Sequence, residues 1–200
     1  MAIKDSKSEQ HIKDTAKQVF FKEGRMQATT QEIADTAGVN RTLLHYYFRS
    51  RDILLDLVFK ESLTQLRSRV HGVVLSQEPF KLKIERIIDT FFEELNNFPY
   101  LETFIVLYMN KHPELYGELF TKLPENPEGM NTLLKEIQSE MQAGTIKEME
   151  PVQFFINLFS LMSYPFIARP LYQNMFNLSN DDYKSILSKR KNVIMSLLFQ

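Results

Sequence analysis

The chain of 200 residues is 44% hydrophobic and 24% charged, with a formal net charge of −1, a composition typical of an ordinary globular protein. It contains no cysteine, which excludes a disulfide scaffold, a thiolate zinc site and a cysteine nucleophile, and which favours a reducing, cytoplasmic location. The first residues, MAIKDSKSEQ, lack the apolar segment of a secretory signal. No stretch approaches the roughly 20 apolar residues of a membrane span, so we expect no membrane partner.

Charge is distributed unevenly along the chain. Residues 1–51 contain 9 Lys and Arg against 6 Asp and Glu, a net charge of +3, and the remaining residues contain 15 against 19, a net charge of −4. A positively charged N-terminal part suits a protein that binds a polyanion. Many ordinary surfaces differ by this much, so the charge distribution agrees with such a function without establishing it.

A first helix is predicted over residues 6–23. Ser6 and Glu9 have the spacing of a capping box, in which each side chain bonds the backbone amide of the other residue. Gly24 is a suitable residue to end the helix, because glycine tolerates the left-handed conformation found after many helices. The residues expected on the buried face are Ile12, Ala16, Val19 and Phe20.

Two short helices follow. Thr29 and Glu32 form a second capping box, and the helix that begins there is expected to end at Gly38. Asn40 is a good N-cap for the third helix. The two helices and their Ala-Gly-Val turn, residues 29–48, have the pattern of a helix-turn-helix, whose second helix enters the major groove of DNA.

The remainder of the chain also has helical patterns. Ser50 is a good N-cap for a longer helix that reaches into the low seventies. Further helices are expected, between breaks at proline, glycine and turn-rich segments, at residues 80–97, 100–111, 114–122, 128–143, 151–169 and 180–198. We therefore predict an all-α fold, with a three-helix helix-turn-helix domain over residues 1–52 and a larger helical domain over residues 53–200.

The third helix carries more large side chains than one face can bury. Leu44 and Phe48, which are four residues apart, are expected to pack into the small core together with Val39. The side chains expected to point outward are Arg41, Thr42, His45 and Tyr46.

The outward residues have the chemistry of DNA recognition. Arg41 can bind the O6 and N7 atoms of guanine bidentately, and Leu43 or the methyl group of Thr42 can contact a thymine methyl group. His45, Arg51 and the neighbouring tyrosines suit phosphate oxygens, which position a protein on DNA without specifying the sequence. The threonines that begin the second helix lie where exposed amides and the helix dipole favour an anion.

The segment TTQEIADTAGVNRTLLHYYFRSRDILL, residues 29–55, resembles the signature of the TetR/AcrR family of transcriptional regulators. Beyond the N-terminal part, the chain agrees with that family only in length, helical content and helix order. Thr42 stands where the family often has glycine, and Arg25 stands where an aromatic residue is common. The positions that match the family's usual DNA contacts are Thr29, Thr30, Asn40, Arg41, Thr42, Leu43, His45, Tyr46, Tyr47 and Arg51.

The resemblance implies a homodimer that binds a double-stranded DNA operator and a C-terminal domain that responds to a ligand. The central helices are rich in phenylalanine, tyrosine and methionine. Plain core packing explains each of these residues singly, but as a set they are compatible with a cavity for a small apolar effector. The candidate pocket residues are Phe91, Phe104, Tyr108, Met109 and Met141.

The last two expected helices carry apolar residues over a broad arc. One face would serve the subunit's own core, and a second could meet the same helices of a partner in a four-helix interface with two-fold symmetry. The family places its dimer interface in this region too. The candidate interface residues are Phe155, Phe159, Met162, Phe166, Leu187 and Ile194.

Patterns of catalysis, metal binding and cofactor binding are weak. The 6 glycines are too widely spaced for a GxGxxG motif or a P-loop, and the 4 histidines form no HExxH pattern. We predict no enzyme, metal or cofactor, and a ligand-responsive homodimeric repressor that binds a pseudo-palindromic operator. The alternatives are a DNA-binding regulator without a small-molecule effector and a helical interaction module that keeps the helix-turn-helix only as a scaffold.

Overall fold

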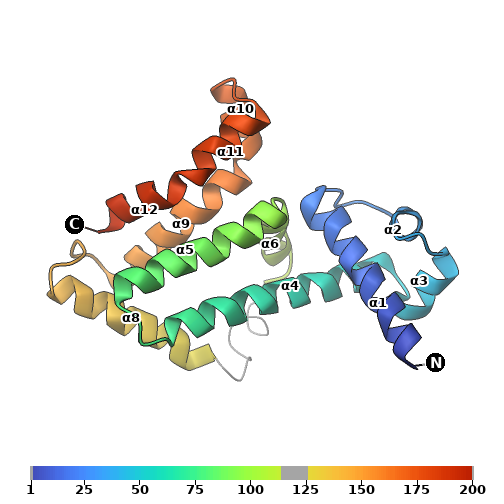
Figure 1. The fold of residues 1–200 in the computed structure, drawn as a ribbon, viewed down its shortest axis with the longest axis horizontal. Coiled ribbons are helices and arrows are strands. Elements are labelled where there is room, and N and C mark those ends of the chain that lie inside the picture. Colours follow the sequence, from blue (N-terminus) through green and yellow to red (C-terminus); the bar gives the residue numbers. More distant parts are fainter. Residues whose placement is uncertain (1, 114–125, 200) are drawn as a thin grey trace.

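The computed structural model describes residues 2–113 and 126–199. Within these ranges the fold is all-α, and its only β pairing is an isolated antiparallel bridge between Ile146 and Phe199. Figure 1 shows a small N-terminal group of helices at one end of the long helix α4 and a larger helical body around the rest of it. The two ends of the chain lie on opposite sides of the molecule.

The helices follow one another as α1 (Ala2–Lys17), the π-helical turn η1 (Gln18–Lys22), α2 (Thr30–Thr36), α3 (Arg41–Phe48), α4 (Arg51–Val74), α5 (Phe80–Asn97), α6 (Leu101–Lys111), α8 (Asn126–Gln142), α9 (Pro151–Ile167), α10 (Arg169–Met175), α11 (Asn180–Ser188) and α12 (Arg190–Leu198). The expected helices at 80–97 and 100–111 are confirmed to within one residue as α5 and α6. The helix expected at 114–122 lies outside the described residues.

The first helix begins earlier than the capping pattern indicated. It starts at Ala2, so Ser6 lies inside the helix and is not its N-cap. The segment before Ser6 contains neither glycine nor proline, and a good cap does not end a helix that can extend past it. The other end is also unusual, because the chain continues into a π-helical turn before Gly24.

The π-helical turn η1 buries three consecutive large residues. Val19, Phe20 and Phe21 are each fully buried, and the amide of Glu23 bonds the carbonyl oxygen of Gln18 at 3.0 Å. A regular α-helix directs neighbouring side chains about 100° apart, whereas the wider π turn changes their spacing. Consecutive aromatic residues of η1 therefore reach different neighbours.

Helix α4 connects the two parts of the molecule. Its N-terminal half packs on α1, where the Lys13 ammonium lies 2.8 Å from the Glu61 carboxylate. Its C-terminal half packs on α5 and α8. There the buried Lys83 Nζ donates to the Val74 carbonyl oxygen at 3.0 Å and lies 2.6 Å from the Glu136 carboxylate.

The single helix expected over 151–169 is instead two helices, α9 and α10, which meet at 68°. Pro165 lacks the amide that would bond the Leu161 carbonyl oxygen. Arg190 Nε donates to that oxygen at 3.2 Å, and the Tyr183 hydroxyl donates to the Pro165 carbonyl oxygen at 2.6 Å. These bonds from α11 and α12 stabilise the bend, because they satisfy one carbonyl group that the proline frees and one that the end of α9 leaves without a helical partner.

The helix expected over 180–198 is likewise divided, into α11 and α12 at Lys189. In the part of the chain that the structure describes, no single helix is long and apolar enough to cross a bilayer. The bent pair α9 and α10 passes that test of length and composition when the two helices are taken together.

Candidate nucleic-acid interface and apolar cavity

The helix-turn-helix is held by local hydrogen bonds that the sequence predicts. The Thr29 side chain accepts from the Glu32 amide at 3.2 Å, and the Thr29 amide donates to the Glu32 carboxylate at 2.7 Å. These bonds from Thr29, with the Arg25 side chain, hold the pKa of Glu32 below its ordinary value. Asn40 Oδ1 accepts from the Leu43 amide at 2.7 Å and so caps α3.

The turn between α2 and α3 has the conformation that its glycine permits. Gly38 has a φ of +65°, and the amide of Val39 bonds the Ala34 carbonyl oxygen at 3.0 Å. His11 of α1 lies with its Nε2 atom 2.9 Å from the Ala37 carbonyl oxygen, which fixes the end of α2 against α1. These contacts hold the end of α2 and the start of the turn in place.

The inward face of α3 is confirmed. Leu44 and Phe48 are buried in one cluster with Ile33 of α2 and Val19 of η1, and Val39 packs against that cluster. Burial of these residues leaves the opposite face of the short helix exposed.

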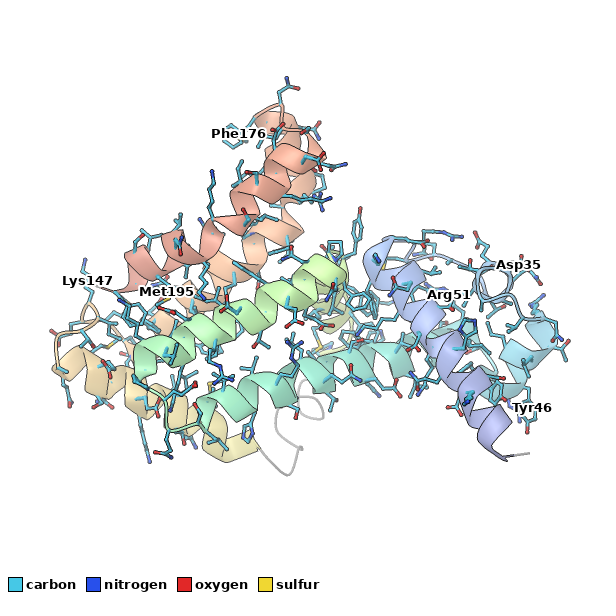
Figure 2. The ribbon with its side chains drawn as sticks, in the orientation of Figure 1. Asp35, Tyr46, Arg51, Lys147, Phe176 and Met195 are labelled. Carbon is cyan, nitrogen blue, oxygen red and sulfur yellow. The ribbon has the colours of Figure 1, made fainter. Side chains whose placement is uncertain are left out.

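The outward face of α3 is polar and aromatic. Tyr46 is 64% exposed, and Figure 2 shows it at the outer edge of α3, away from the body. Arg41, Thr42, His45 and Arg49 are also exposed. Among the described residues, no side chain bonds to Arg41 or Arg49, so both guanidinium groups are available to a ligand. This face can donate hydrogen bonds to an anionic or base-bearing partner.

The other expected contact residues are placed differently. Thr29 is exposed and Thr30 is half-buried at the start of α2, and Asn40 is exposed at the start of α3. Leu43 and Tyr47 are half-buried, and the Tyr47 ring contacts Tyr46 edge-on at a centroid distance of 5.2 Å. Tyr47 therefore supports the exposed ring of Tyr46 as well as the core.

Arg51 is engaged within the protein. Its Nε donates to the Ala28 carbonyl oxygen at 3.0 Å, one of its terminal nitrogens donates to the Met26 carbonyl oxygen, and the other lies 2.6 Å from Asp52. The guanidinium group thus fastens the loop before α2 to the start of α4. A phosphate contact by Arg51 stays a prediction.

Arg49 is a cation that the sequence interpretation left without a role. Its φ of +59° at the end of α3 is uncommon for a residue with a side chain, and the side chain is exposed. The Arg-Ser-Arg pattern signalled two cations at this point. Only the fold shows that Arg51 turns back into the protein while Arg49 remains exposed.

The N-terminal helices are joined to the body at the turn between α5 and α6. The Tyr100 amide donates to the Phe21 carbonyl oxygen at 3.0 Å. A Cβ atom at Gly24, where φ is +73°, would lie 2.9 Å from the Tyr100 ring. Phe21 also contacts Phe104 of α6 at a centroid distance of 5.3 Å. A movement of the first residues of α6 would therefore displace Phe21 of η1 and Gly24, which they contact.

The body encloses an apolar cavity of about 460 Å³ between α4, α5, α6, α8 and α9. Among the residues that the structure describes, its polar lining groups are Arg67, His71 and Glu102. The remaining lining residues are Leu63, Leu66, Val70, Val74, Ile87, Phe91, Ile105, Gly129, Met130, Leu133, Phe155 and Phe159. The cavity therefore suits a mostly apolar molecule of drug-like size.

Two polar atoms of this wall are unusual. His71 Nε2 and Glu102 Oε2 are buried and have no hydrogen-bond partner among the described residues. Burial raises the pKa of the Glu102 carboxyl group, although a hydrogen bond with Ser163 acts in the opposite direction. In the same described ranges, no group of three or more acidic or histidine side chains is arranged to hold a metal ion.

Of the five residues proposed for the pocket, Phe91 lines the cavity. Phe104 and Tyr108 instead pack on Phe59, with centroid distances of 5.0 and 4.7 Å. Met109 is buried, and Met141 packs against the core from outside it. The composition shows that the central helices are rich in aromatic residues, but it does not show which side of each helix faces the cavity.

Four of the six residues proposed for a dimer interface are buried within the subunit: Met162 and Ile194 fully, and Phe166 and Leu187 nearly so. Burial in the subunit's own core leaves these four side chains little surface for a second subunit. Phe155 and Phe159 are half-buried and line the cavity, and their part in an interface stays a prediction. The apolar residues exposed on the same helices, here called the α9–α12 strip, are Val152, Ile156, Tyr164, Ile186, Val193 and Leu197.

A helix-turn-helix that exposes arginine, histidine and tyrosine on its second helix, next to an all-α body, defines a DNA-binding protein of the helix-turn-helix class. Residues 12–58 match the family described as bacterial regulatory proteins, tetR family. The N-terminal part of the chain therefore matches the DNA-binding domain of this family of regulators.

Comparison with individual proteins agrees with the family. The HTH-type transcriptional repressor KstR2 of Rhodococcus jostii (strain RHA1) is 24% identical to this chain over 136 residues. These residues are 68% of this chain and 63% of that protein, so the match spans less than two thirds of the repressor. The ketosteroid transcriptional regulator KstR2 of Mycobacterium tuberculosis has the same fold, with a TM-score of 0.63 at 12% identity over 96% of this chain and 95% of its own. The transcriptional regulator FadR from Bacillus subtilis, solved with stearoyl-CoA, gives a TM-score of 0.63 at 19% identity over 94% and 98% of the two chains.

Proposed function

We propose that the protein is a homodimeric repressor that binds a pseudo-palindromic operator and is released from it by a small apolar effector. The observation that carries the proposal is the exposed face of α3, where Arg41 and Arg49 stand on either side of His45 and Tyr46 and bond to no side chain among the described residues. Such a face combines donors for base edges with cations for phosphates.

The packing of α3 indicates which residues would contact bases and which would contact phosphates. Arg41, Thr42 and Leu43, near the N-terminus of the helix, would reach base edges in the major groove. His45 and Tyr46 would contact phosphates, together with the start of α2 and with Arg49. Two such helices in a dimer would read successive major grooves about 34–36 Å apart, or a larger span if the two half-sites are more widely spaced.

Dimerisation is supported by the α9–α12 strip. Its six exposed apolar residues come from α9, α11 and α12, of which α12 packs on both of the others. Apolar residues gathered on the surface of neighbouring helices often mark a site of association, and the same surface on two subunits can form a two-fold interface. We place the boundary between the DNA-binding domain and the ligand-binding and dimerisation domain near residue 52, and the protein in the cytoplasm with the DNA that it regulates. The repressor of Rhodococcus jostii to which the chain is similar supports repression over activation.

An effector role is supported by the cavity and by its connection to α1. A fold relative has been solved with stearoyl-CoA, a ligand with a long apolar chain. In this protein Glu102 lines the cavity, and Tyr100, two residues earlier, contacts Gly24 and Phe21. An effector that shifts the start of α6 would change the position of the DNA-binding domain, provided that it binds the two arrangements with different affinity.

The decisive experiment is a titration of the protein with duplex DNA from upstream of its own gene, at several salt concentrations. Sequence preference combined with an affinity that falls steeply with salt is the expected result. Duplex binding that is absent at every salt concentration would contradict the proposal. Repetition of the titration with apolar compounds tests the effector role, for which we expect release of the DNA.

A further inference from the structure

Glu102 is a carboxyl group in the apolar wall of the cavity. It is 9% exposed, and its Oε2 atom is buried without a hydrogen-bond partner among the described residues. Nearly all buried polar atoms in folded proteins are paired, because an unpaired one destabilises the native state. Because Glu102 also lines the cavity, a molecule that enters the cavity can supply the partner that this carboxyl group lacks.

The protonation of Glu102 indicates what that partner offers. Burial raises the pKa of the carboxyl group, which holds it toward the neutral form. A neutral carboxyl group has one O–H donor. Ser163 of α9 hydrogen-bonds to this carboxyl group, and the Oε2 atom remains without a partner among the described residues. The partner would then be a hydrogen-bond acceptor.

Among the described residues of the wall, the other charged group disfavours two alternatives. Arg67 lines the same cavity and carries a positive charge, which would repel a cationic ligand. An anionic ligand would have to leave water for a mostly apolar space, which costs free energy unless a cation pairs with it, and the Arg67 side chain already has an interaction within the protein. An uncharged molecule avoids both costs, and the many aliphatic and aromatic lining residues match an apolar body.

We propose that the effector is an uncharged, mostly apolar molecule that carries an oxygen acceptor, such as a ketone, ester or hydroxyl oxygen, and that the Glu102 carboxyl group binds this oxygen. The inference rests on the effector role proposed above. It makes Glu102 the specificity-determining residue of the cavity, at a position two residues from the Tyr100 contact with the DNA-binding domain.

The test uses the neutral dye N-phenyl-1-naphthylamine, which fluoresces in apolar sites, and four competitors of matched chain length. These are undecane, 2-undecanone, undecanoic acid and undecylamine. For the unaltered protein we expect the ketone to displace the dye at an about tenfold lower concentration than the hydrocarbon, the effect of one hydrogen bond. Both charged competitors should be weaker than the ketone.

Substitutions separate the hydrogen bond from general apolar binding. Glu102→Leu should make the ketone and the hydrocarbon equal competitors, whereas Glu102→Gln, whose amide still donates, should retain the preference for the ketone. Glu148→Leu removes an exposed carboxyl group outside the cavity and should leave the order of the competitors as in the unaltered protein.

The thermal midpoint distinguishes a ligand-binding group from a structural one. Replacement of an unpaired buried carboxyl group by leucine should raise the Tm by a few degrees. If Glu102 mainly supports the fold through Ser163, the same substitution lowers the Tm and the proposal fails.

Other outcomes also overturn the proposal. The strongest displacement by undecylamine would mean that Glu102 is an ionised partner for a cation, and the strongest displacement by undecanoic acid would make Arg67 the anchor. Equal displacement by ketone and hydrocarbon in the unaltered protein would show that Glu102 makes no bond. If the dye itself does not bind, the effector role of the cavity fails, rather than the role of Glu102 alone.

Discussion

Helices α3 and α9 each carry more large side chains than one face can bury, and the large side chains that they expose differ in chemistry. Helix α3 exposes Tyr46 between arginines, whereas α9, which contains no charged residue, exposes Val152 and Ile156. Polar aromatic residues flanked by cations suit a polyanion, and aliphatic residues without charge suit another apolar surface. The polarity of the exposed large side chains, rather than their number, therefore distinguishes the proposed DNA surface from the proposed subunit interface.

The largest effect is expected from a charge in the α9–α12 strip. Ile156→Glu would place a carboxylate in the proposed interface, where burial of an unpaired charge opposes association. We expect monomers and a loss of operator affinity of at least about 100-fold, because the two half-sites would no longer be bound together. Sedimentation and fluorescence anisotropy measure the two effects.

Leu75→Glu provides the control, since Leu75 is 43% exposed at the end of α4 and lies outside the strip. Its mass in solution should equal that of the unaltered protein. A dimer that survives Ile156→Glu would contradict the interface and leave the strip without a proposed use.

A smaller effect is expected on the α3 side. Arg41→Ala should weaken operator binding by about 1–3 kcal/mol and relax the preference at one base pair, because alanine cannot bind guanine bidentately. Binding to a set of single-base operator variants measures the effect. Arg86→Ala, which removes an exposed arginine of α5, is the control. Unchanged affinity after Arg41→Ala would show that Arg41 does not read a base.

The junction between the two regions can be tested at Gly24. Gly24→Ala should lower the free energy of unfolding by about 1 kcal/mol through its positive φ, and by about 1–3 kcal/mol more through the clash with the Tyr100 ring. Gly144→Ala is a matched control, because Gly144 has a similar φ of +76° and no atom within 4 Å of an added Cβ. The free energy of unfolding is measured by urea denaturation. If it decreases equally in Gly24→Ala and Gly144→Ala, the Tyr100 ring moves away from the added methyl group without an energetic cost.

The two arginines after α3 should separate DNA binding from stability. Arg49→Ala should reduce the slope of log affinity against log salt by about 0.9 for each phosphate that the arginine neutralises, and leave the Tm unchanged. Arg51→Ala should lower the stability by about 1–2 kcal/mol, because two backbone carbonyl groups would no longer have a charged donor. An unchanged Tm for Arg51→Ala would restore it as a candidate phosphate-binding residue.

The smallest effect concerns pH. Because burial raises the pKa of folded Glu102, its contribution to stability is fully present below the ordinary value of 4.5 and is lost as the pH rises through the folded pKa. In the unaltered protein the free energy of unfolding should therefore decrease as the pH rises from 4.5 through the folded pKa of Glu102. In Glu102→Gln this decrease should be smaller, because glutamine does not titrate. Parallel pH profiles of the two proteins would show that Glu102 titrates normally.

Much of the DNA-binding domain could be predicted because its signals are local. The Thr29–Glu32 capping box, the Asn40 cap and the positive φ of Gly38 each depend on residues within a few positions of one another. The spacing of Leu44 and Phe48 identified the buried face of α3 for the same reason. The start of α1 was not predictable in this way, because a capping pattern permits a helix end without requiring one.

The sequence by itself determined the helical class, the helix-turn-helix and the polar character of the outer face of α3, since these follow from short-range spacing and side-chain chemistry. Only the tertiary structure decided that Arg51 turns inward, that Phe155 and Phe159 line a cavity, and that Ile156 lies on the surface. Helix α9 has one narrow polar face, with Gln153, Asn157 and Ser160 exposed, and apolar residues on every other side. That face indicates which side meets solvent, but it does not indicate which of the flanking apolar residues are covered. The orientation of α9 is fixed by α5, α6, α8 and α12, which reach α9 only when the distant parts of the chain come together.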